Sequence, residues 1–96
     1  MTSPTTKYTT PVFNINGTSR ETVLEELHKT RKLLNKAIEA LCAVTCHPRD
    51  FQFSPEGAWA QADFEKSKAI ADAFDALDWV DAWITVSYTH LRAHET

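Results

Sequence analysis

The sequence predicts an all-α fold in which two long antiparallel helices form a hairpin. Two long segments carry apolar side chains at the spacing of one helical face. A short connection, HPRDFQF at 47–53, separates them and contains a proline that interrupts helical structure. Because a short connection leaves two helices side by side, we expect them to pack as an antiparallel pair.

Residues 1–17 are expected to form an extended N-terminal arm outside the hairpin. Residues 1–11 are rich in Thr, Ser and Pro, and Lys7 is their only charged side chain. The apolar segment VFNI at 12–15 precedes Asn16-Gly17, which is a turn signal. No partner strand follows, so we interpret 12–15 as a strap that lies on the helices.

The first helix is predicted over about 19–45, within a hairpin domain spanning 18–85. Thr18 and Glu21 have the spacing of a capping box, in which each side chain satisfies a free amide at the helix start. Pro48 disfavours helix in the residue before it and so sets the end. The residues expected on the inner face are Val23, Leu27, Leu34, Ala37, Ile38, Leu41 and Val44.

The second helix is predicted over about 55–84. Ser54 is a suitable N-cap, Pro55 suits the first helical position, and Glu56 suits the positive end of the helix dipole. The residues expected on its inner face are Trp59, Ala62, Ile70, Ala73, Phe74, Leu77, Val80 and Ile84.

Charge supports this pairing, because the first helix is basic in its middle and the second is mostly acidic. With a turn near Asp50, the basic stretch is expected to lie level with about residues 64–72. Asp81, which projects onto the apolar face, is expected to pair with Arg20. The basic residues are Lys29, Arg31, Lys32 and Lys36, and the acidic ones are Asp63, Glu65, Asp72, Asp75, Asp78 and Asp81.

The second helix carries three aromatic side chains that a single two-helix hairpin cannot bury by itself. Phe64 and Trp79 fall on its back and Trp83 at the edge of its apolar face. The arm, sequence beyond the C-terminus, or a second subunit would each cover them. Exposed aromatic surface favours association, so we expect a homo-oligomeric bundle with Phe64, Trp79 and Trp83 at its interface.

The connection between the helices offers one candidate ligand site. Arg49 beside Phe51 and Phe53 places a charge next to stacking surfaces, which suits a nucleotide, and Lys36 of a partner subunit would add a phosphate contact. The structural alternative is favoured: Arg49 binds the carbonyls that end the first helix, and the phenylalanines close the end of the hairpin.

Composition and motifs argue against several classes of function. The net charge of −3 is unlike that of a general nucleic-acid binder. No apolar run reaches membrane-spanning length, so we expect a cytoplasmic protein. Cys42 and Cys46 are interpreted as small apolar side chains at the end of the first helix. Together with His47 they would supply three ligands to a metal ion, but no fourth ligand is evident. No catalytic grouping or cofactor motif is present, and we therefore expect a protein that is not an enzyme.

The last residues, VSYTHLRAHET at 86–96, resemble the translation of a sequencing adapter. The resemblance implies that this segment is a non-native tail and that the natural sequence beyond about residue 85 is not visible. His90 and His94 have a spacing that would suit a metal site on a helix, but we exclude them because they lie in the tail. Deleting residues 86–96 is expected to leave the fold unharmed.

Residues 12–84 resemble a group of small proteins of unknown function from phage genomes and gut metagenomes. The features that carry the resemblance are FNINGTS at 13–19, a leucine-rich first helix, PRDF at 48–51 and an alanine-rich second helix. It implies a phage accessory protein in a bacterial host, acting through protein–protein contacts and self-association. The alternative is an oligomeric sponge that sequesters a cyclic nucleotide immune signal.

Overall fold

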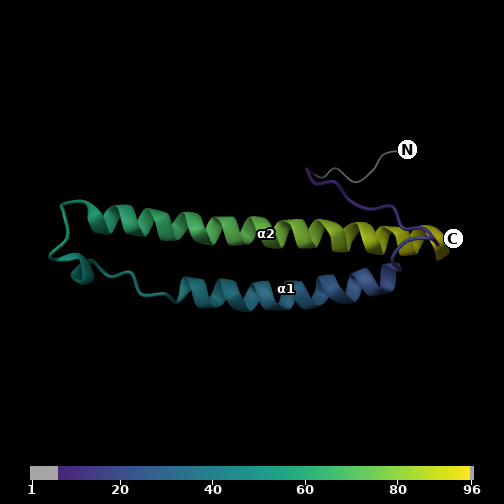
Figure 1. The fold of residues 1–96 in the computed structure, drawn as a ribbon, viewed down its shortest axis with the longest axis horizontal. Helices are drawn as coiled ribbons and strands as arrows, with labels where there is room; N and C mark the ends of the chain where they lie inside the picture. The colour runs from purple at the N-terminus through teal and green to yellow at the C-terminus, as the bar shows by residue number, and fades with distance from the viewer. Residues whose placement is uncertain (1–6, 96) are drawn as a thin grey trace.

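The computed structural model describes the backbone of residues 7–95 and the side chains of residues 7–88. It contains two α-helices, α1 (Arg20–Cys42) and α2 (Ala58–Glu95), and a short 3-10 helix, η1 (Pro48–Phe51), in the connection between them. The two helices lie side by side and antiparallel, and no strand forms in the described part of the chain (Figure 1). The predicted all-α hairpin with an N-terminal arm is confirmed.

The start of α1 is capped one residue later than predicted. The Ser19 hydroxyl accepts a hydrogen bond from the amide of Thr22 at 3.2 Å and donates one to the Thr22 hydroxyl at 2.8 Å. The side chain of Glu21 pairs with Arg20 at 2.7 Å and does not complete a box with Thr18. Its carboxylate also accepts from its own backbone amide, and the two contacts lower the pKa of Glu21.

The end of α1 comes at Cys42, three residues before the predicted position. The ammonium group of Lys66, on α2, donates to the carbonyls of Cys42 at 3.2 Å and Val44 at 2.6 Å. The indole N–H of Trp59 donates to the carbonyl of Cys46 at 3.1 Å. These contacts hold the chain after α1 against the first turns of α2, so its carbonyls need no further helical partners.

The start of α2 comes at Ala58, three residues after the predicted position. Gly57 has a φ of +84°, a left-handed conformation that interrupts helical structure before it. The amide of Ala58 donates to the carbonyl of Pro55 at 3.1 Å, so Pro55 and Glu56 belong to a turn. The helix then runs to Glu95, past the predicted end at Ile84.

The register of the hairpin differs from the predicted one by about three turns. Arg31 forms an ion pair with Asp81 at 2.7 Å, whereas the sequence placed the basic residues level with residues 64–72 and paired Asp81 with Arg20. The prediction was wrong because it assumed helical structure up to Thr45. The chain leaves α1 at Cys42 and runs on beside the first turns of α2 before it reverses (Figure 1).

Among the side chains that the structure describes, the buried core is thin and lies toward the open end of the hairpin. Leu27, Val80 and Ile84 form its centre, with Val23, Leu24, Leu34 and Trp83 packed against them. Ile38, Leu77 and Val86 are also buried. So few buried apolar side chains stabilise an isolated hairpin only weakly.

The segment after residue 85 continues α2, and its first residues pack against the rest of the fold. Val86 is buried, and the fully buried Ser87 donates its hydroxyl to the carbonyl of Trp83 at 2.9 Å. The hydroxyl of Tyr88 lies 3.2 Å from Nε2 of His28, an exposed residue on α1. The side chains of His90 and His94 lie outside the described residues.

These contacts change the expected result of shortening the chain. Truncation after Tyr88 should leave the melting temperature of the protein unchanged, as the adapter interpretation expects for the whole tail. Truncation after Thr85 should lower the unfolding free energy by about 1 kcal/mol, because it removes the buried side chain of Val86. Thermal denaturation of both truncated chains checks this. An unaltered melting temperature after truncation at Thr85 would show that residues 86–88 contribute nothing.

Candidate interaction surface

The chain, with its arm included, exposes far more surface than a compact protein of its mass. Its accessible surface is 7429 Å², whereas a compact monomer of this mass exposes roughly 5,600 Å². Its radius of gyration is 19.4 Å, against roughly 12.5 Å for a compact domain of the same length. The excess is a property of the elongated shape, 64 Å in its longest extent. Surface of this extent is available for a partner.

The two long flanks of the hairpin, where α1 and α2 meet, differ in polarity. One carries the Arg31–Asp81 ion pair and the contact of His28 with Tyr88. Winding both helices at about 100° per residue puts small and apolar side chains on the other flank, together with the carboxylates of Glu26, Glu65 and Asp72. We call this the alanine flank; its small and apolar residues, all exposed, are Leu33, Ala37, Ala40, Ala69 and Ala76.

The N-terminal arm folds back along α2 and covers part of the aromatic surplus (Figure 1). The indole N–H of Trp83 donates to the carbonyl of Thr9 at 3.2 Å, and the Trp83 ring lies 4.8 Å from that of Trp79. The hydroxyl of Tyr8 donates to the carboxylate of Asp78 at 3.4 Å. The arm therefore accounts for Trp83, which is half-buried, while Trp79 stays 39% exposed.

Removing the arm should expose Trp83 without unfolding the hairpin. Deleting residues 1–17 retains the Ser19 cap, so the helical circular dichroism signal should persist. The tryptophan emission should shift to longer wavelength and become more accessible to acrylamide, because the contacts with Thr9 are lost. The same deletion in a Trp83→Phe background should change the emission less. An unchanged emission spectrum in the first variant would contradict the position of the arm.

Two phenylalanines of α2 are exposed outside the alanine flank. Phe64, predicted at an oligomer interface, is 64% exposed. Phe74, predicted on the inner face, is 51% exposed, so that assignment was wrong. The alanines of α2 give a weak contrast between its faces, which is why the helical pattern did not place Phe74 correctly.

The candidate ligand residues of the connection do not form an enclosed site. Phe53 is fully exposed and Phe51 half-buried, so Phe53 does not close the end of the hairpin as expected. The carbonyls that end α1 are bound by Lys66, not by Arg49. The exposed Arg49 lies in η1, where its backbone amide donates to Nδ1 of His47 at 3.2 Å.

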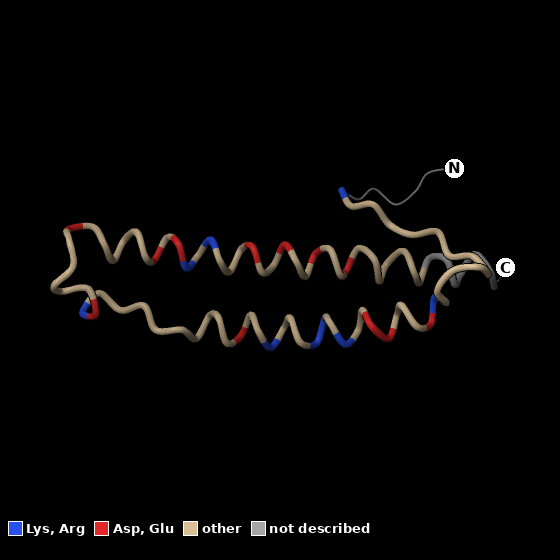
Figure 2. Tube along the Cα trace, in the orientation of Figure 1, with Lys and Arg blue, Asp and Glu red and all other residues tan. Residues whose placement is uncertain are grey.

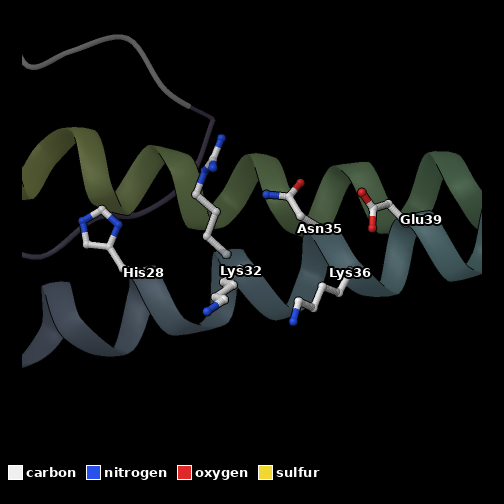
Figure 3. A pocket seen from close by; sticks show the side chains of 6 residues that line it. His28, Lys32, Asn35, Lys36 and Glu39 are labelled. Atoms are coloured by element: carbon white, nitrogen blue, oxygen red, sulfur yellow. The ribbon is translucent and has the colours of Figure 1, made fainter.

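Lys36 lies away from this connection, beside a shallow depression of about 330 Å³ on α1. The lining residues are His28, Arg31, Lys32, Asn35, Lys36 and Glu39. Figure 3 shows Lys32 and Lys36 on the side of α1 turned away from α2. Because Arg31 is paired with Asp81, the two lysines are the cations that remain for an anion, and Glu39 partly offsets them.

The described residues contain no group of three or more His, Cys, Asp or Glu side chains that a metal ion could bridge. Cys42 is exposed and Cys46 half-buried, and both are free thiols. Within the described chain, no helix combines the length and the apolar character that crossing a membrane requires. Comparison with protein-family models, curated proteins and solved structures finds no match.

Proposed function

We propose that this chain is a small, non-enzymatic accessory protein of phage type that acts through self-association and protein–protein contacts. The observation that carries the proposal is the surface of 7429 Å² on a hairpin with a thin core. A chain that buries so little by itself gains stability when a partner covers its apolar surface. The phage part of the proposal draws its support from the sequence resemblance over residues 12–84.

Self-association predicts that stability depends on protein concentration. The melting temperature followed by circular dichroism should rise by several degrees between about 1 and 100 μM, because mass action favours the associated folded state. A chain that folds alone would melt at one temperature throughout this range, and that result would contradict the proposal. The Ile15→Ala variant is a suitable control, because Ile15 is 98% exposed on the arm and should leave the concentration dependence unaltered.

A second candidate function is the sequestration of a cyclic nucleotide. Lys32 and Lys36 beside the depression on α1 favour an anionic ligand, and Arg49 with Phe53 offers a separate charged and stacking surface. Calorimetry against cyclic di- and trinucleotides tests it. Loss of binding on Lys36→Ala would assign the ligand to the depression, and loss on Arg49→Ala would assign it to the connection. A panel without binding would remove this candidate.

A further inference from the structure

We infer that a second copy of the chain packs on the alanine flank with its α1 against α2 of the first copy, so that two hairpins form a four-helix bundle. The inference rests on the proposed self-association and adds a contact surface and an orientation to it. The surface inferred here has contributions from both helices and differs from the interface predicted from the sequence, with Phe64, Trp79 and Trp83, which stays a prediction.

The side chains of the alanine flank suit close helix packing. Small residues let helix axes approach to about 8–10 Å, and Ala37, Ala69 and Ala76 are small and exposed. Leu33 is 56% exposed and lies on a different side of α1 from the buried Leu27 and Ile38. A second copy would bury this side chain, and burying a leucine contributes roughly 1.5–3 kcal/mol.

The register within one chain sets which residues meet between two chains. The Arg31–Asp81 and Lys66–Cys42 contacts place Leu33 within one turn of the level of Ala76. In a dimer whose two-fold axis runs parallel to the helices, both connections lie at the same end. Residues that are level within one chain are then also level between the two chains. Leu33 of one copy then lies opposite Ala76 of the other, so a large side chain meets a small one.

The length of the contact between copies is bounded at both ends. A stable interface buries roughly 800 Å² or more on each partner, so the contact must extend over several turns of both helices. The arm covers Trp83 near the open end of the hairpin. The contact between copies is therefore confined to the half of the hairpin nearest the connection, where the alanine flank is uncovered.

Charge selects the orientation of the second copy. Figure 2 shows the basic residues gathered in the middle of α1 and acidic residues spread along α2. Lys29, Lys32 and Lys36 form no ion pair among the described residues. Packing α1 against α2 of the other copy sets basic side chains near acidic ones, whereas packing α2 against α2 sets acid against acid.

Two charge substitutions on the alanine flank test the inference, with a matched control on another face. Ala37→Glu and Ala76→Lys each bury an unpaired charge in the proposed interface, while both positions are exposed in the single hairpin. Each should weaken dimerisation by about tenfold or more in sedimentation velocity. Ala71→Glu introduces the same charge on the outer, exposed face of α2 and should dimerise like the unmodified chain.

Mixing the two flank variants tests the orientation. In a mixed dimer Glu introduced at 37 lies within reach of Lys introduced at 76 of the other chain, and the second contact is unmodified, so dimerisation should return to within about threefold of normal. Failure of the mixture to associate would overturn the packing of α1 against α2. Normal dimerisation of both single variants would overturn the flank but leave self-association standing. A monomeric unmodified chain would overturn the proposed function itself.

Discussion

Replacing Leu27 with alanine is expected to lower the unfolding free energy of the protein by about 2–4 kcal/mol. Leu27 is 6% exposed and lies at the centre of the core with Val80 and Ile84. A single small hairpin has little stability in reserve, so the variant should be largely unfolded at room temperature. Urea denaturation followed by circular dichroism measures the loss.

A matched substitution outside the core shows whether the loss of stability comes from burial of the side chain or simply from removing an apolar side chain. Ile15→Ala removes a branched apolar side chain that is 98% exposed, and it should alter the unfolding free energy by less than about 0.5 kcal/mol. Equal losses in the Leu27 and Ile15 variants would show that the core is not where the structure places it.

Replacing Lys66 with methionine is expected to lower the unfolding free energy by about 1–2 kcal/mol. Methionine keeps the length of the apolar stem, so the change removes chiefly the hydrogen bonds to the carbonyls of Cys42 and Val44. The chain after α1 would lose its attachment to α2 at that point. In a Cys42→Ser background, the thiol of Cys46 should therefore react faster with a thiol reagent.

Lys68→Met is the control for this prediction. Lys68 pairs with Asp72 at 3.1 Å, but both side chains are more than half exposed, and an exposed pair one helical turn apart contributes about 0.3–0.5 kcal/mol. The reactivity of Cys46 should stay unchanged in this variant. A Lys66 variant that behaves like the Lys68 variant would refute the capping role of Lys66.

The sequence predicted the helices well because periodicity and turn chemistry act locally. Leu27, Val80 and Ile84 were assigned to inner faces and are buried, and the Asn16-Gly17 turn forms with the amide of Gly17 donating to the carbonyl of Asn14 at 3.2 Å. The helix ends were less accurate. Ser19, not Thr18, is the N-cap of α1. The positive φ of Gly57 places the start of α2 after the predicted residue.

The register and the capping role of Lys66 were not predictable in the same way, because both depend on contacts between distant residues. The sequence pattern marks the second helix as mostly acidic and gives Lys66 no role of its own, although a lysine in the early turns of an acidic helix was the available signal. The position of the arm on Trp83 is likewise a contact between residues far apart in the chain. The alanine flank likewise depends on a distant contact, because the Arg31–Asp81 pair determines which sides of the two helices face each other.

The central claim, that this hairpin works as an assembly of copies, is tested most directly by sedimentation equilibrium of the unmodified full chain. At about 100 μM, we expect a mass of twice the 10.9 kDa of one chain, falling toward the monomer on dilution. A mass of 10.9 kDa throughout the concentration range would contradict the account.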